Sequence, residues 1–179
     1  MPFPPLRNLI NWRLLATHLL AVFFLTLGIR QFMLLRVIDV LTVYQDAGFA
    51  GVQHMELKGR WDSAGELVTY LHYVRLLPPT LAGLIGCALS WVVVTRLRER
   101  RAIPVLVFLT NLLVSRQGLY RPNAVTHIEE ALRWPLTALS LPAQLWVAGF
   151  VLTTAGLLLV AVPLLVRKRP ATAPASLPR

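Results

Sequence analysis

The stretch Leu141–Val166 decides the fold of this chain: it reads LPAQLWVAGFVLTTAGLLLVAVPLLV and contains no charged residue. An α-helix rises about 1.5 Å per residue, so the stretch is long enough to cross a hydrocarbon core about 30 Å thick. It ends at Arg167, Lys168 and Arg169, whose charges are suited to water and lipid headgroups. The stretch therefore predicts a transmembrane helix.

The composition of the whole chain indicates the same class of protein. The 179 residues are 56% hydrophobic with a mean hydropathy of +0.61, which is too apolar for a soluble domain of this size. In a soluble chain the net charge of +10 would suggest nucleic-acid binding, but in a membrane protein such cations report orientation, and nucleic acid is not an expected partner. Cys87 is the only cysteine, which excludes a disulfide framework within the chain.

Three further apolar runs predict transmembrane spans, at about 14–35, 76–97 and 102–120. The first is interpreted as an uncleaved signal anchor, because no small-residue cleavage site follows its apolar core. The second opens at Pro78 and Pro79, which the first turn of a helix tolerates. The third is uncharged only over 102–115, so it crosses the membrane only if its helix continues through Arg116 to Tyr120.

The distribution of charge predicts the orientation of these spans. The two termini and the turn 96–101 hold ten cations and one acid, a net charge of +9. The two other segments, about 36–75 and 121–140, counted together with Arg30 and Arg116 near the ends of the adjoining spans, hold eight cations and seven acids, a net charge of +1. Because cytoplasmic loops carry the excess of Lys and Arg, both termini are expected in the cytoplasm. A three-span arrangement would put the basic turn and the basic tail on opposite sides.

The predicted fold is therefore all-α: a four-helix transmembrane bundle, N-in/C-in, with short amphipathic helices on its extracytoplasmic side. We expect one transmembrane domain over 1–166 and a disordered cytoplasmic tail over 167–179. The expected location is the cell membrane, that is, the inner or plasma membrane of a bacterium.

The outer segments contain signals for local structure. Ser63 and Glu66 fit a capping box, so a helix is expected from about Ala64 directly into the second span. Thr126 and Glu129 repeat this signature and predict a short interfacial helix that ends before Pro135, with Trp134 at headgroup depth. The glycines at 48, 51 and 59 suggest turns that would fit a small hairpin.

Two arginines near the outer ends of spans are candidates for binding an anion, a lipid or a partner. Arg30 lies about 24 Å beyond Leu14, and Arg116, with Gln117 beside it, occupies a similar depth in the third span. A pair of guanidinium groups can clamp a phosphate or carboxylate by paired hydrogen bonds. The explanation we favour is simpler: each arginine reaches the interface or pairs with Glu66 or Glu130.

The outer segments also hold His54, Glu56, His72 and His127, whose side chains are of the types that bind zinc or transfer protons. Their spacing matches no metal motif, and HExxH is absent from the sequence. Surface histidines and helix-capping acids explain these residues without chemistry. Our main prediction is therefore that the protein has no metal site and no cofactor. The alternative is that these four residues form a metal or acid–base site.

Within the spans, four residues are predicted to pack helices together. Ala82, Gly86 and Ser90 recur at every fourth position, which lets two helix backbones approach closely. Asn111 is a second interhelical hydrogen-bonding point, and we expect His18 to donate or accept a hydrogen bond with a neighbouring helix.

The sequence contains no phosphate-binding glycine loop, no nucleophile elbow, no filter-like motif and no CxxC. The leading hypothesis is an accessory or assembly subunit that binds another integral membrane protein, for example of a secretion or sorting system. Besides membrane lipids, the expected partner is that protein or a second copy of the chain. The alternatives are a small outward-facing membrane enzyme or lipid- or anion-binding protein, and an oligomeric channel or transporter subunit.

Overall fold

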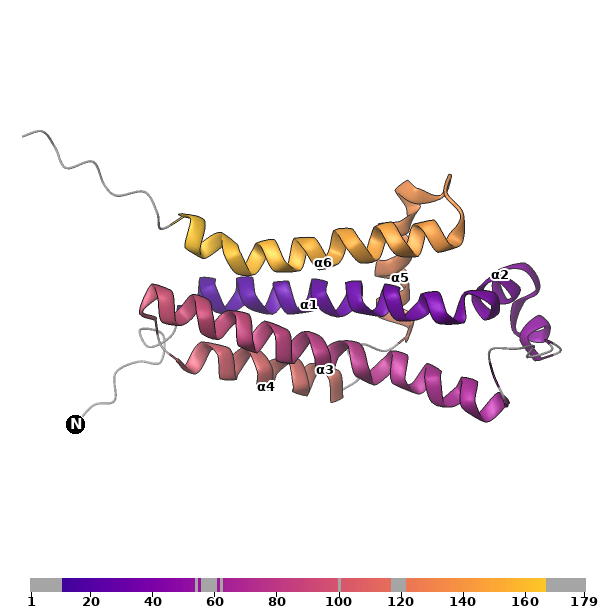
Figure 1. Cartoon of the computed structure of the whole chain (residues 1–179), viewed down its shortest axis with the longest axis horizontal. Coiled ribbons are helices and arrows are strands. Elements are labelled where there is room, and N and C mark those ends of the chain that lie inside the picture. Colours follow the sequence, from indigo (N-terminus) through magenta and orange to yellow (C-terminus); the bar gives the residue numbers. More distant parts are fainter. Residues whose placement is uncertain are drawn as a thin grey trace, which may run out of the picture.

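The computed structural model describes residues 11–53, 55, 61, 63–99, 101–116 and 122–166, and every element in this part of the chain is a helix. The elements, shown in Figure 1, are α1 (Trp12–Leu34), η2 (Leu35–Val37), α2 (Ile38–Gln53), α3 (Ala64–Leu97), α4 (Ala102–Arg116), α5 (Pro122–Arg133), η3 (Trp134–Leu136) and α6 (Leu141–Val166).

Three helical stretches are long and apolar enough to cross a membrane: α3, α6, and the continuous stretch that begins with α1 and runs into α2. α1 lies in the middle of the bundle, with α6 on one side and α3 on the other, and α4 lies alongside α3 (Figure 1). The described part of the protein is therefore all-helical, and its three long apolar helices are compatible with a multi-pass membrane protein. Apolar runs predict such helices because a run of this length has few other stable environments.

The helix expected over 102–120 is observed as α4 over Ala102–Arg116. Its 15 residues rise about 22 Å, which is less than the hydrocarbon thickness of about 30 Å. Residues 117–121, on which a complete crossing depends, lie outside the described residues, as does the tail 167–179. The described part of α4 is thus too short to cross the hydrocarbon core, whereas the three long helices are long enough.

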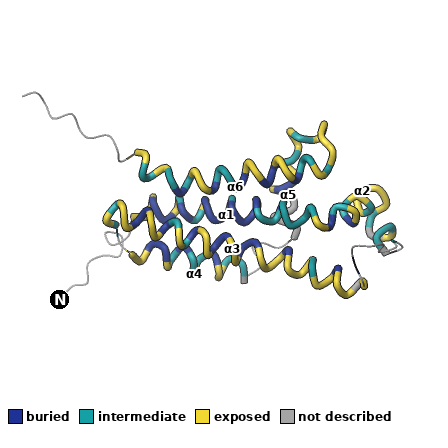
Figure 2. Tube along the Cα trace, viewed as in Figure 1, coloured by how far each residue is buried: buried dark blue, intermediate teal, exposed yellow. Residues whose placement is uncertain are grey.

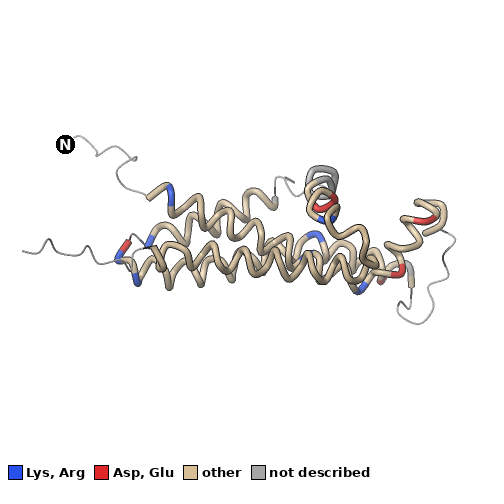
Figure 3. Tube along the Cα trace, turned by 90° about the horizontal axis from the view of Figure 1, so that it is seen from above, with Lys and Arg blue, Asp and Glu red and all other residues tan. Residues whose placement is uncertain are grey.

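The start of α1, the end of α3, the start of α4 and the end of α6 lie at one end of the bundle (Figure 1). Asn11, just before α1, donates from Nδ2 to Oε1 of Glu99 in the turn after α3, at 3.4 Å. This turn is tight, because Arg98 caps α3 in the left-handed conformation with φ 55°. Figure 3 shows that the described cations of this end greatly outnumber its acids.

The core follows α1, which is buried on the side facing α6 and on the side facing α3 (Figure 2). Close approach of α1 and α6 depends on glycine. A Cβ on Gly156 would come within 2.9 Å of the Ala21 carbonyl oxygen, and a Cβ on Gly28 within 3.0 Å of the Gly149 carbonyl oxygen. The opposite side of α6 is exposed and apolar, as expected for a surface that faces lipid.

The hairpin suggested by the glycines at 48, 51 and 59 is wrong for the described residues, because the chain is helical through Gln53. Gly48 kinks α2 by taking φ 65°, a conformation that glycine adopts without a steric penalty. Beyond the kink, Val52 packs against a group of residues drawn from η2, α2 and α3. A second, smaller apolar cluster forms there from Val37, Val40, Trp61 and Leu67, outside the main core.

Two caps were predicted, and the structure treats them differently. At α3, the Ser63 hydroxyl accepts a hydrogen bond from the Glu66 amide at 3.2 Å, and the helix runs from Ala64 to Leu97 without interruption, as expected. α5 instead begins at Pro122, four positions before the predicted cap at Thr126. Proline suits the first turn of a helix, because the amide hydrogens there have no partner. The helix therefore begins at Pro122, and Glu129 lies within it and is not part of a cap.

Candidate functional site

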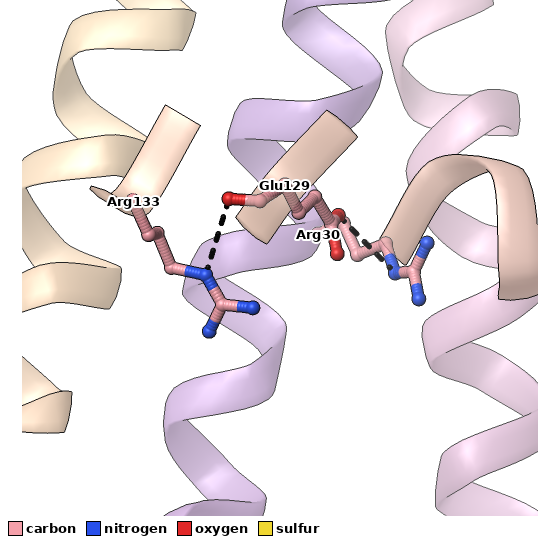
Figure 4. A network of polar contacts seen from close by, with 3 residues as sticks. All are labelled: Arg30, Glu129 and Arg133. Atoms are coloured by element: carbon pink, nitrogen blue, oxygen red, sulfur yellow. Dashed lines mark hydrogen bonds and ion pairs between the residues drawn. The ribbon is translucent and has the colours of Figure 1, made fainter. Parts of the chain in front are cut away.

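The most unusual polar feature is an ion pair between α1 and α5 near the C-terminal end of α1. We call this end of the bundle the outer end, after the predicted orientation. α5 runs across the bundle rather than along it (Figure 1), which brings Glu129 to within 3.6 Å of Arg30, measured from Oε1 to Nε. The Arg30 side chain is 21% exposed and that of Glu129 only 3%. Figure 4 shows Arg133 on the other side of Glu129, donating from Nε to the Glu129 backbone carbonyl at 3.3 Å.

Burial is the dominant influence on Glu129, and it raises the pKa of this carboxyl above its ordinary value. The charges of Arg30 and Arg133 act in the opposite direction, as does the amide of Gln31, whereas Glu130 reinforces the rise in pKa. Gln31 is buried, and neither its Oε1 nor its Nε2 makes a hydrogen bond of ordinary geometry. The ion pair therefore joins α5 to α1. We call Arg30, Glu129 and Arg133 the clasp, and its carboxylate is closed off from solvent.

A second polar site lies where η2 meets the outer end of α3. Arg36 is exposed, and its guanidinium carbon lies 5.4 Å from the ring centre of Trp61 and 5.0 Å from that of Tyr70. The Tyr70 hydroxyl donates to the Met33 carbonyl at 2.8 Å, which fixes the ring against α1. The two aromatic rings thus hold one cation in place between η2 and the N-terminal part of α3.

Polar contacts inside the bundle join neighbouring helices. The ring Nδ1 of His18 lies 2.8 Å from the hydroxyl of Ser90, and both residues are fully buried. Asn111 on α4 donates to the carbonyl of Pro79 on α3 at 2.7 Å. Within the small-residue stripe, Ala82 is buried and Gly86 lies against the side chain of Val22 on α1. These contacts join α1 to α3 and α3 to α4 and stabilise helix packing.

Removing the Ser90 hydroxyl is expected to destabilise the protein modestly. In Ser90→Ala the His18 ring loses its described partner, and interhelical hydrogen bonds in membranes contribute about 1 kcal/mol. Thr95→Ala is the matched control, because the Thr95 hydroxyl bonds only to the carbonyl of Trp91 in its own helix. Reversible unfolding in detergent measures both variants, and an equal loss in the two would contradict a role for the interhelical bond.

The other predicted site residues are not gathered into one site. Glu66 and His72 lie at the outer end of α3, and Glu130 is exposed on α5, next to the buried Glu129. Arg30 pairs with Glu129. Three predicted residues, His54, Glu56 and Gln117, lie outside the described residues, and so do the side chains of Arg116 and His127. Among the described residues, no three His, Cys, Asp or Glu side chains could hold a metal ion together.

Sequence reasoning missed Glu129, Arg36 and the glycines between α1 and α6. Glu129 sits among polar neighbours in the sequence, and only the path of α5 reveals that it is buried. The glycines did leave a signal, because Gly149 and Gly156 lie one heptad apart in α6, with Thr153 between them. Compared with protein families, curated proteins and solved structures, the chain matches none of them.

Proposed function

We propose that this protein is an accessory or assembly subunit of the cell membrane, with four spans and cytoplasmic termini, that binds another integral membrane protein. The orientation is supported by charge: Arg13, Arg96, Arg98 and Arg101 lie at one end of the bundle with Glu99. Cations concentrated at one end favour that end as the cytoplasmic one. A fourth crossing requires the path of α4 to be completed through residues 117–121.

The observation that carries the proposed role is the length of α3. A long span takes about 25 residues, so of the 34 residues of α3 at least the first nine or so, about 64–72, project beyond the hydrocarbon. Two apolar side chains in this projecting part are nonetheless exposed, Val68 by 65% and Leu71 by 41%. Lipid tails do not cover side chains at this height. Exposed apolar groups outside the membrane are typical of surfaces that bind a partner.

α4 indicates which side of α3 is left open. Asn111 bonds to Pro79, so α4 covers that side of α3 from Pro79 towards the cytoplasmic end. Val68, Leu71, His72 and Arg75 continue the same side upwards at helical spacing, and all four are exposed. We call these four residues the outer α3 face. A transmembrane helix of a partner, continuing above the membrane as α3 does, would fit beside α4 and cover this face.

The anion-binding alternative has less support, because Arg30 is already paired with a buried carboxylate. An anion at Arg30 would have to compete with Glu129, which belongs to the same chain and whose side chain is only 3% exposed. The enzymatic alternative needs an open site with several titratable groups, and the clasp around Glu129 is closed.

Site-specific photo-crosslinking tests the proposed role. A photoreactive amino acid in place of Leu71, in protein made at native levels, is expected to yield an adduct with one integral membrane protein that also co-purifies in mild detergent. Val68→Glu should abolish this adduct by placing a charge in the interface. The control replaces Tyr44, an exposed aromatic residue on α2, and should not give the adduct. Adducts with lipid alone, with a second copy alone, or equally from Tyr44 would refute the proposal.

A further inference from the structure

We infer that the groove beside Arg36 is a phospholipid-binding site, with the phosphate on Arg36 and an acyl chain along the groove floor. The groove lies between the end of α1 and the outer turns of α3 and has a volume of about 290 Å³. Its upper part holds Arg36, Trp61 and Tyr70, and its lower part holds Met33 and Leu77. This inference concerns a different surface from the outer α3 face and does not depend on the proposed partner.

The depth of the groove matches the membrane surface. Arg36 lies 22 positions after Leu14, or about 33 Å along the helix axis, just beyond a hydrocarbon core about 30 Å thick. Met33 lies about one turn deeper on the same helical path. Along α3, Leu77 likewise lies about one turn deeper than Tyr73, which also lines the groove. The groove therefore runs from headgroup level into the region of the acyl chains.

The chemistry of Arg36 selects an anion at the upper end. Its guanidinium carbon lies 5.4 Å from the ring centre of Trp61 and 5.0 Å from that of Tyr70, so the two rings hold the cation in the groove. A guanidinium carries several N–H donors in one plane, which suits a paired interaction with two phosphate oxygens. A fixed, exposed cation at headgroup depth is complementary to a lipid phosphate.

The floor of the groove distinguishes a lipid from a free anion. Met33, Tyr73 and Leu77 offer an apolar surface immediately below the cation, which a soluble phosphate would not use. Glu66 also lines the rim, so the upper end carries charges of both signs. A phosphodiester attached to an acyl chain satisfies both the cation and the floor with one molecule.

Native mass spectrometry of the delipidated, full-length protein in detergent tests this site. The added probes are phosphatidylglycerol, phosphatidylethanolamine, diacylglycerol with matched chains, and inorganic phosphate. We expect one tightly bound phospholipid per protein. Diacylglycerol should bind at least tenfold more weakly, because it lacks the phosphate and the charge-assisted hydrogen bonds that the phosphate would accept from Arg36. Equal binding of diacylglycerol would refute the phosphate contact. Displacement of the lipid by inorganic phosphate at low concentration would identify a free-anion site and refute the lipid.

Variants assign the binding to the groove. Arg36→Gln should weaken phospholipid binding about tenfold, whereas Arg101→Gln, which removes an exposed cation that also lies near an aromatic ring, that of Trp91, should leave it unchanged. Leu77→Trp fills the groove and keeps Arg36, so it should also weaken binding, and it answers the question if Arg36→Gln fails to fold. Unchanged binding in Leu77→Trp, or equal losses in the two arginine variants, would overturn the assignment.

Discussion

Replacing Gly156 with leucine is expected to separate α6 from α1 and to unfold the bundle under conditions in which the wild type is stable. A Cβ at this position would lie 2.8 Å from Cγ of Leu25, 2.9 Å from the Ala21 carbonyl oxygen and 3.1 Å from the Leu25 amide nitrogen. Two of these three atoms belong to the backbone of α1, which cannot rotate away as a side chain can. The helices must therefore move apart.

The expected loss exceeds the cost of about 1–3 kcal/mol for an overpacked core, because moving the helices apart also weakens the contacts of Gly28 with α6. Within a membrane such contacts matter more, since lipid competes equally well for apolar surfaces and close packing provides much of the helix association. Thermal unfolding in detergent measures the effect. Ala88→Leu is the control, because Ala88 is exposed on α3 and an added side chain there meets no helix. Similar melting temperatures for Gly156→Leu and wild type would contradict the close α1–α6 contact.

The same interface shows how far the sequence could predict the fold. Hydropathy locates a helix because crossing the bilayer needs a long apolar run, and the cap at Ser63 is local chemistry within four residues. Which helix packs against which is a property of pairs of segments. Gly28 lies against Gly149 although the two are 121 positions apart, and nothing in either neighbourhood specifies the other. Their partnership emerges only when α1 lies between α3 and α6.

The candidate sites were harder to predict for a related reason. The residue types were informative: Arg30 is costly in hydrocarbon and was expected either to bind an anion or to pair within the chain. Its partner could not be identified, because the choice among Glu66, Glu129 and Glu130 depends on where α5 begins and which side it turns to α1. A shift of one residue along a helix rotates a side chain by about 100°, which separates the buried Glu129 from the exposed Glu130.

The pairing of Arg30 leads to the second large prediction, that Arg30→Ala destabilises the protein at neutral pH and much less in acid. Removing one member of a buried pair leaves an uncompensated charge and costs about 3–5 kcal/mol. We expect the lower end, about 3 kcal/mol, because the Arg30 side chain is partly exposed and solvent screens its charge. The loss falls on α5, whose attachment to α1 includes this pair.

The pH dependence follows from the direction of the pKa shift of Glu129. Burial raises the pKa of Glu129 in the folded protein above its value in the unfolded chain, and the charges of Arg30 and Arg133 oppose that rise. The folded protein therefore binds this proton more tightly. The resulting stability is fully present below the unfolded-state pKa and is lost as the pH rises through the folded-state pKa. Without Arg30 the folded-state pKa of Glu129 rises further. The stability of Arg30→Ala therefore begins to fall at a similar pH but has fallen further by neutral pH.

Denaturation of wild type, Arg30→Ala and the double variant Arg30→Ala with Glu129→Gln, each across acid to neutral pH, tests this account. Glutamine keeps the shape of Glu129 without its charge, so the double variant should recover most of the stability at neutral pH and lose the added pH dependence. Arg75→Ala, an exposed cation on α3, should change stability by no more than about 0.5 kcal/mol. A loss in Arg30→Ala that is equal at all pH values, or that Glu129→Gln does not relieve, would mean that Arg30 acts through packing of its aliphatic stem and that the clasp is not electrostatic.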